Sequence, residues 1–218
     1  MSTSPRARSA ILFDLDGTLV DSIPLIVASM RHAFRGRTHA PTDDAWIATL
    51  GRPLASQMSD WAVSPADSDT LIAEYRAYQI AHHDALMRRY EGVAETVAAL
   101  ASIGHPMAIV TSKTVALTRR ALEWAGLAAH FDVIIGLEST TRHKPDPEPV
   151  RLACERLGVP PAAAWFVGDS PFDILAGNAA GARTCAALWG PFRRDQIAPA
   201  APSAWAGRIS EVPAIVGS

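Results

Sequence analysis

The feature that most constrains the fold is a short apolar run that ends in two aspartates. Ala-Ile-Leu-Phe at 10–13 is followed by Asp14, and Asp16-Gly17 comes two positions later. Such a run is typical of a parallel strand that is buried on both faces. Because residues two apart in an extended chain project to the same side, Asp14 and Asp16 can share one site at the carboxyl end of this strand. A turn-forming role, the alternative, accounts for Asp16-Gly17 but not for Asp14.

The composition sets the class of protein. The chain has 218 residues, of which 49% are hydrophobic, enough for a large core with or without an inserted domain. A net charge of -2 gives no basic field for nucleic acid, and no apolar run approaches the length of a membrane span. The only cysteines, Cys154 and Cys185, lie in apolar patterns and indicate a reducing compartment. We therefore expect a cytoplasmic monomer or homodimer that binds neither nucleic acid nor a membrane.

Lysine is rare in this chain. The 20 basic residues are 18 arginines and two lysines, Lys113 and Lys144. Because arginine replaces lysine almost everywhere else in the chain, we expect these two lysines to have specific roles.

The order of predicted elements gives the architecture. Residues 20–89 contain helical patterns and no strand-like run, whereas residues 90–218 alternate helix and strand. Alternating units of this kind predict a parallel sheet with helices on both faces. The fold class is therefore α/β, with a Rossmann-like core formed by residues 1–19 and 90–218 and an inserted α-helical cap formed by residues 20–89.

Three local expectations accompany this architecture. Ser22 is expected to cap the first helix of the cap, and the segment 198–207, rich in Ala and Pro, to form a surface loop. The long helix predicted over 67–86 is expected to pack on the cap through the residues at helical spacing, which are Leu71, Tyr75, Tyr78 and His82.

Polar residues follow three later strands. Thr111-Ser112-Lys113 offers hydroxyl and backbone N–H groups to phosphate oxygens, although Ser112 could instead cap a helix. Lys144 precedes a helix start, and Asp169 and Asp173 follow the next-to-last strand. Since Ser170 and Asp173 have the spacing of a capping box, the sequence leaves open whether Asp173 is functional or structural.

These motifs resemble those of the haloacid dehalogenase-like superfamily. The resemblance is carried in order by 14–18 (Asp-Leu-Asp-Gly-Thr), Thr111, Lys144, and Gly168-Asp169 with Asp173. The cap position and the Tyr90-Glu91-Gly92-Val93 return to the core are similar to the phosphoglycolate phosphatase-like branch, which has a helical cap of the C1 type.

The resemblance implies a role for each motif residue. Asp14 would attack phosphorus to give an aspartyl-phosphate, and Asp16 would act as general acid and base. Mg²⁺ would be held by Asp14, the backbone carbonyl of Asp16 and Asp169, with Asp173 behind these ligands. The phosphate oxygens would be bound by Thr111, Ser112 and Lys144.

The substrate implied is a small phosphorylated metabolite, phosphoglycolate first. Inorganic pyrophosphate and sugar phosphates are the alternatives, including a β-phosphoglucomutase-like reaction, although Ile26 stands where those mutases carry a histidine. Asp16 argues against dehalogenases and phosphonate-cleaving relatives, which carry a non-acidic residue there. A non-enzymatic phosphate-binding module is disfavoured by the intact carboxylates and Lys144. Arg52, between Gly51 and Pro53, is the candidate for binding the non-reacting part of the substrate; a solvated arginine is the alternative.

Overall fold

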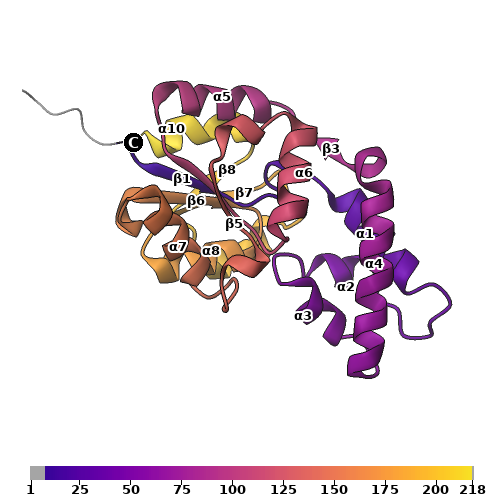
Figure 1. Ribbon diagram of the computed structural model, residues 1–218. Helices are drawn as coiled ribbons and strands as arrows, with labels where there is room; N and C mark the ends of the chain where they lie inside the picture. The colour runs from indigo at the N-terminus through magenta and orange to yellow at the C-terminus, as the bar shows by residue number, and fades with distance from the viewer. Residues whose placement is uncertain (1–7, 218) are drawn as a thin grey trace, which may run out of the picture.

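A six-stranded sheet forms the centre of the molecule (Figure 1). The computed structural model describes residues 8–217. Every neighbouring pair of strands in this sheet is parallel. In spatial order the strands are β5 (Val133–Ile135), β4 (Met107–Val110), β1 (Ala10–Phe13), β6 (Ala164–Gly168), β7 (Arg183–Ala187) and β8 (Ala204–Ala206). The predicted α/β class with a Rossmann-like sheet is confirmed.

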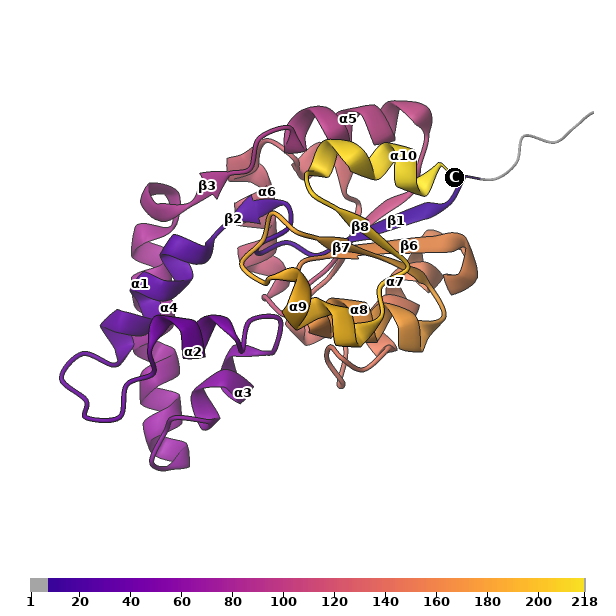
Figure 2. The ribbon, with the colours of Figure 1, turned by 180° about the vertical axis from the view of Figure 1, so that it is seen from behind.

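Helices cover both faces of the sheet because the side chains of the central strand β1 are buried alternately on one face and the other. Ile11 and Phe13 belong to a cluster with residues of α5, α6 and α10, whereas Ala10 and Leu12 pack with residues of α7 and α8. Figures 1 and 2 show α5 and α10 on one side of the strands and α7 and α8 on the other. The bounds are α5 (Val93–Ile103), α6 (Val115–Ala125), α7 (Glu148–Leu157), α8 (Pro171–Ala180), α9 (Arg194–Ile197) and α10 (Val212–Val216). Single 3₁₀ turns lie at Ala128–His130, Leu137–Ser139, Pro161–Ala163, Ala198–Ala200 and Ile209–Glu211.

Four helices lie apart from the sheet and form the cap (Figure 1). They are α1 (Ile23–Ala33), α2 (Asp43–Ile47), α3 (Leu54–Ser59) and α4 (Pro65–Leu86). Their shared interior is built around Trp46, Met58 and Leu71, each fully buried. The segment is joined to the core by a two-stranded antiparallel pair, β2 (Val20–Asp21) with β3 (Arg88–Arg89). We propose this pair as the boundary of a cap domain of residues 20–89.

The expected surface loop at 198–207 was wrong. Residues 204–206 form β8, which pairs in parallel with β7 at the edge of the sheet, and Ala206 is fully buried. The alternation of Ala and Trp at 204–206 suits an edge strand, but the prolines earlier in the segment led to the prediction of a loop.

The expected buried face of α4 was also wrong in its second half. The buried residues are Leu71, Tyr75, Gln79 and His83, while His82 is exposed. Steps of four residues keep one face turned inward along this helix, so a polar residue, Gln79, lies on the buried side.

Among residues 8–217, no helix, the 22-residue α4 included, is both long enough and apolar enough to cross a bilayer.

Candidate active site

The site lies where the carboxyl ends of β4, β1 and β6 meet. These three strands are neighbours in register, with Phe13 beside Ile109 on one side and Val167 on the other. Asp14, Thr111 and Asp169 follow these strand ends, so they converge on one edge of the sheet. The Asp14 amide donates to the Val167 carbonyl at 2.9 Å, which extends the pairing to the first aspartate.

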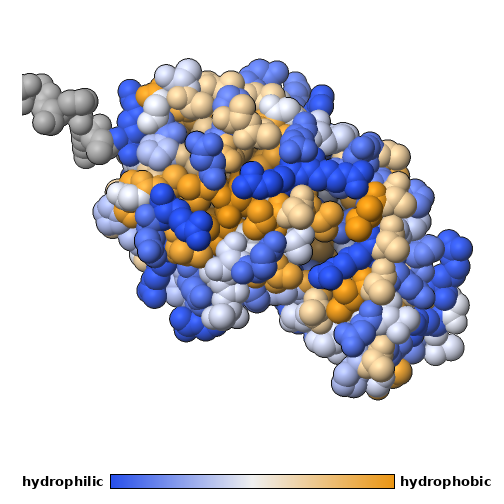
Figure 3. All heavy atoms as spheres, viewed as in Figure 1, coloured by the Kyte–Doolittle hydropathy of each residue, from blue (hydrophilic) through white to orange (hydrophobic). Residues whose placement is uncertain are grey.

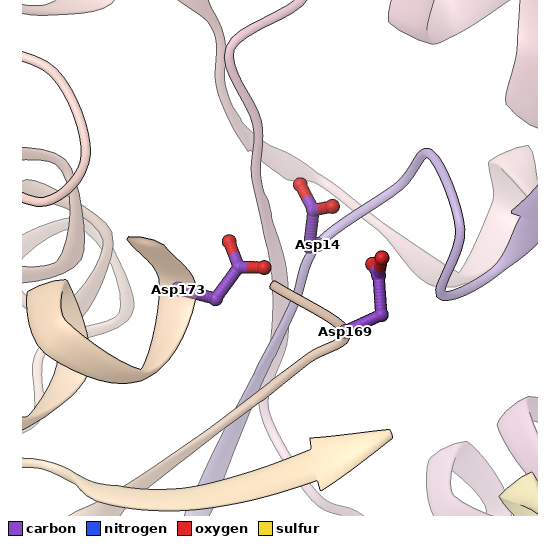
Figure 4. A group of neighbouring side chains, drawn as sticks. All are labelled: Asp14, Asp169 and Asp173. Atoms are coloured by element: carbon purple, nitrogen blue, oxygen red, sulfur yellow. The ribbon is translucent and has the colours of Figure 1, made fainter. Parts of the chain in front are cut away.

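Three buried carboxylates gather at this edge (Figure 4). One oxygen from each of Asp14, Asp169 and Asp173 lies within 4.8 Å of the others, and none of the three residues is more than 5% exposed. They come from the end of β1, the turn after β6 and the first turn of α8.

Asp173 has both of the functions that the sequence left open. Its Oδ2 accepts from the Ser170 amide at 3.0 Å and the Ser170 hydroxyl at 2.6 Å, which completes a capping box at the start of α8. Its Oδ1 accepts from Lys144 Nζ at 2.5 Å. The helix cap therefore holds Asp173 in the site.

Lys144 is the cation that balances this cluster. Its Nζ lies 2.9 Å from Asp14 Oδ1 as well as 2.5 Å from Asp173 Oδ1, and its side chain is only 2% exposed. Burial by itself disfavours the charged amine, but the two carboxylates outweigh that effect and raise the pKa of Lys144. Lys144 is thus a fixed ammonium between two aspartates.

One ammonium does not compensate three carboxylates. Burial raises the pKa of Asp14 to about 7, an effect that Lys144 opposes and that Asp173 and Asp16 increase. Burial, together with the charges of Asp14 and Asp173, likewise raises the pKa of Asp169 well above its ordinary value. Ionised together, the three would leave two uncompensated negative charges, which a hard divalent cation with oxygen ligands relieves. The donor set therefore fits such a cation.

Asp169 is fixed by small neighbours and one hydroxyl. Thr18 Oγ1 donates to Asp169 Oδ1 at 2.7 Å, and Trp189 Nε1 donates to the Thr18 carbonyl at 2.9 Å. Gly17 has φ +88°, and a Cβ there would lie 2.6 Å from Asp169 Oδ2. Only glycine combines this backbone conformation with that close approach.

Asp16 is not part of the cluster of three buried carboxylates and has partners of its own. Its Oδ1 accepts from Lys113 Nζ at 2.6 Å and from Ser22 Oγ at 2.5 Å, and its side chain is 21% exposed. Ser22 therefore does not cap α1 with its side chain, as the sequence had suggested, but holds Asp16 instead. Asp16 lies at the open side of the site, next to the cap.

The hydroxyls expected to bind phosphate lie beside Asp16. Thr111 Oγ1 accepts from the Lys113 amide at 3.2 Å. Ser112 Oγ donates to the Gly51 carbonyl at 2.6 Å, which links the core to the cap loop. Both residues line the same pocket as Asp14 and Lys144, and phosphate binding by them stays a prediction.

Arg52 also lines this pocket, but its guanidinium has partners within the cap. Nη1 lies 2.6 Å from Asp60 Oδ2, and Nη2 donates to Asp60 Oδ1 at 3.2 Å and to Ser56 Oγ at 2.7 Å. Substrate binding by Arg52 stays a prediction, in which the substrate would compete with these bonds.

The pocket lies between the core and the cap, and in Figure 3 this face of the molecule is hollowed there. Its volume is about 90 Å³. The core contributes Asp14, Asp16, Thr111, Lys144 and Asp169. Apolar side chains from both parts also line the pocket, namely Ile26, Leu50 and Leu54 of the cap and Leu117 and Leu137 of the core. The site is thus a small chamber with carboxylates at one end.

The sequence profile of the haloacid dehalogenase-like hydrolases matches residues 11–187. This chain belongs to that family. It is 39% identical over 184 residues to pyrophosphatase PpaX of Bacillus velezensis, which covers 83% of each chain. Its fold matches the crystal structure of a predicted phosphoglycolate phosphatase from Haemophilus somnus, with a TM-score of 0.86, 26% identity, and 95% of this chain and 97% of that chain covered. A haloacid dehalogenase-like hydrolase from Streptococcus pneumoniae matches with a TM-score of 0.82, 26% identity, and coverage of 95% and 98%.

The predicted family and the predicted enzyme class, a haloacid dehalogenase-like phosphatase, are confirmed at that level. The compound that this member of the family hydrolyses is a separate question.

Sequence reasoning assigned no contact to three residues of this haloacid dehalogenase-like site. Lys113 pairs with Asp16, and its status as one of only two lysines was the available signal. Gly190 lies against Asp169, where a Cβ would overlap Asp169 Cβ and lie 2.8 Å from the Gly17 carbonyl. Thr18, inside the first motif, anchors Asp169. For Gly190 the sequence carries no signal, because the contact joins segments far apart in the chain.

Proposed function

We propose that this protein is a Mg²⁺-dependent phosphatase that hydrolyses a short organic phosphomonoester through an aspartyl-phosphate on Asp14. The observation that carries the proposal is the position of Asp14. Its carboxylate is buried at the end of β1, bonded to Lys144, and lines the same small pocket as Asp16. A nucleophile and a separate proton carrier that line one chamber suit a two-step displacement at phosphorus.

In the first step, an Asp14 carboxylate oxygen forms a bond to phosphorus while the bond from phosphorus to the ester oxygen breaks. The leaving alkoxide takes a proton from Asp16. In the second step, water attacks the aspartyl-phosphate, Asp16 takes its proton, and the Asp14 carboxylate and inorganic phosphate are released. Asp16 needs a fixed orientation for both transfers, which its bonds to Lys113 and Ser22 support.

Lys144 and the strand-end hydroxyls would stabilise charge. The Lys144 ammonium at 2.9 Å from Asp14 reduces the repulsion between that carboxylate and an incoming phosphate. Thr111 and Ser112 line the pocket and offer hydroxyls to the phosphoryl oxygens. Mg²⁺ held by Asp14, Asp169 and the Asp16 carbonyl would supply further neutralisation of phosphoryl charge when bound.

The size of the pocket supports a small substrate. A water molecule needs about 10–15 Å³ of cavity, so about 90 Å³ corresponds to roughly six to nine waters. A phosphoryl group with a short carbon chain fits that space.

The apolar wall supports an organic substrate. Leu50 and Leu54 of the cap and Leu117 and Leu137 of the core line the chamber with Ile26. Inorganic pyrophosphate has no carbon chain to contact these side chains. A short carbon chain between the phosphoryl group and a polar end complements them.

Pyrophosphatase activity is the second candidate. It is favoured by the 39% identity to a relative named pyrophosphatase PpaX. Sugar phosphates are a weaker candidate, since Ile26, which lies 5% exposed on the pocket wall, offers no polar group to a sugar.

The test is release of phosphate with Mg²⁺ from phosphoglycolate, inorganic pyrophosphate, β-glucose 1-phosphate and 4-nitrophenyl phosphate. We expect the highest kcat/KM for phosphoglycolate and no turnover after treatment with EDTA. A higher kcat/KM for pyrophosphate would establish the second candidate instead. If none of the four compounds releases phosphate, the proposed phosphatase function is wrong and a phosphate-binding module is favoured.

A further inference from the structure

The polar groups that the cap presents to the pocket differ in whether they already have partners. On the loop side, Arg52 is bonded to Asp60 and Ser56, and Gln57 is bonded to the Arg52 carbonyl and to Thr49. Substrate binding by these groups would break bonds that already exist. They are therefore unsuited to be the main contacts of a ligand.

Helix α4 presents the opposite situation. Tyr75, Arg76 and Gln79 all line the pocket from this helix. Gln79 is 5% exposed as a residue, and its amide forms no hydrogen bond among residues 8–217, but that amide is not one of the fully buried unpartnered polar groups and is therefore open to the pocket. An amide that lines a pocket without a protein partner can bond a ligand there without breaking an existing hydrogen bond.

Arg76 lies one helical turn before Gln79 on the same wall. It is exposed and forms no ion pair or hydrogen bond among residues 8–217. The cap residues that line the pocket include no aspartate or glutamate, so the charge of Arg76 is not balanced there. This part of the wall is cationic and rich in hydrogen-bond donors.

We propose that Gln79 and Arg76 of α4 determine specificity by binding a terminal carboxylate of the substrate, separated from the phosphoryl group by a short carbon chain. The inference rests on the proposed phosphatase function and assigns the residues that recognise its leaving group. The Gln79 amide and the Arg76 guanidinium donate to the carboxylate oxygens. The carbon chain lies along the apolar wall, and the phosphoryl group meets Asp14.

The experiment compares phosphoglycolate with ethyl phosphate, which has the same length but no carboxylate. The readout is the ratio of kcat/KM for the two substrates, measured with Mg²⁺. We expect Gln79→Leu, which keeps the size of the side chain, to lower this ratio about ten- to a hundredfold. Arg76→Gln should lower it about tenfold. Arg35→Gln removes an exposed cap arginine that does not line this pocket, and it should leave the ratio at the wild-type value.

Each outcome is decisive. A ratio within twofold of wild type in both α4 variants would overturn the assignment. If the α4 variants lower kcat/KM for inorganic pyrophosphate but leave the ratio for phosphoglycolate and ethyl phosphate unchanged, the group bound by α4 is not a carboxylate. Because Arg76 is exposed, its variant folds even if Gln79→Leu does not, and it then decides alone. If the wild type hydrolyses none of these compounds, the proposed function itself fails, and this inference with it.

Discussion

Lys113 Nζ lies 2.6 Å from Asp16 Oδ1, and the lysine side chain is only 7% exposed. One of the two lysines in the chain is thus bonded to the nucleophile candidate Asp14, and the other to the proton-carrier candidate Asp16. The two aspartates of the first motif have separate cations, which keeps their carboxylates apart and oriented for different tasks.

We expect Lys113→Met to lower kcat/KM about ten- to a hundredfold, because a hydrogen bond to a charged group contributes about 1.5–3 kcal/mol. The loss should be smaller for 4-nitrophenyl phosphate than for an alkyl phosphate, since nitrophenolate leaves without a proton from Asp16. Phosphate release from both substrates measures this difference. An equal loss on both would show that Lys113 acts on the phosphoryl group rather than on Asp16.

Mg²⁺ should stabilise the protein more at pH 8 than at pH 5. The pKa of Asp14 is raised to about 7 by burial, and that of Asp169 is raised as well. The folded state therefore holds protons that the unfolded state loses near pH 4, and without metal these groups make stability fall as the pH rises from about 4 to 7. Above that range the ionised carboxylates bind Mg²⁺ without proton competition. Thermal melting with EDTA or with excess Mg²⁺ at each pH measures the difference, and a larger Mg²⁺ effect at pH 5 would contradict the metal assignment.

Gly190→Ala should reduce activity and stability together. A Cβ at this position overlaps Asp169 Cβ and lies 2.8 Å from the Gly17 carbonyl, so Asp169 has to move. Overpacking of this kind costs about 1–3 kcal/mol. Gly207→Ala is the matched control, because its Cβ would lie 3.7 Å from Glu211, an ordinary contact. Melting temperature and kcat are the measurements; a Gly190 variant with wild-type values of both would show that Asp169 tolerates displacement.

Ser112→Ala should loosen the cap loop over the site. The variant loses the hydrogen bond from Ser112 Oγ to the Gly51 carbonyl, whereas Ser102→Ala removes a hydroxyl bonded only within α5. Hydrogen exchange of residues 48–58 in the absence of ligand should be faster in the first variant than in the second. If Ser112 served only to bind phosphate, exchange without ligand would be the same in both, and only inhibition by phosphate would weaken.

Arg52→Ala should lower the melting temperature by about 2–4 °C, which corresponds to about 1 kcal/mol for a part-exposed ion pair in a protein of this size. Asp60→Ala removes the partner and should have a similar effect. Neither variant should change the ratio of kcat/KM for phosphoglycolate and ethyl phosphate. A lowered ratio in Arg52→Ala alone would support the sequence-based prediction that Arg52 binds substrate.

The sequence by itself determined the alternation of strands and helices along the core, and it showed which strands end in carboxylates. The run at 10–13 is apolar at every position, which only a strand buried on both faces tolerates, and β1 is indeed fully buried. Asp14 and Asp169 could be predicted to meet because parallel strands of one sheet share a carboxyl edge, whereas the place of Lys144 was implied only by the resemblance to the family. β8 could not be predicted, because an edge strand rich in alanine is stabilised by pairing with β7 rather than by its own pattern.

Only the tertiary structure decided which polar side chains are already bonded. Arg52 and Gln79 are both polar cap residues in the sequence, but Asp60, eight residues beyond Arg52, is bonded to its guanidinium, while Gln79 lines the pocket and its amide has no hydrogen-bond partner in the described part of the chain. Lys113 is 97 residues from Asp16, and Gly190 is brought to Asp169 by the return of the chain after β7. Such pairings depend on how separate segments pack, whereas a local sequence pattern reports only the burial and periodicity of its own segment.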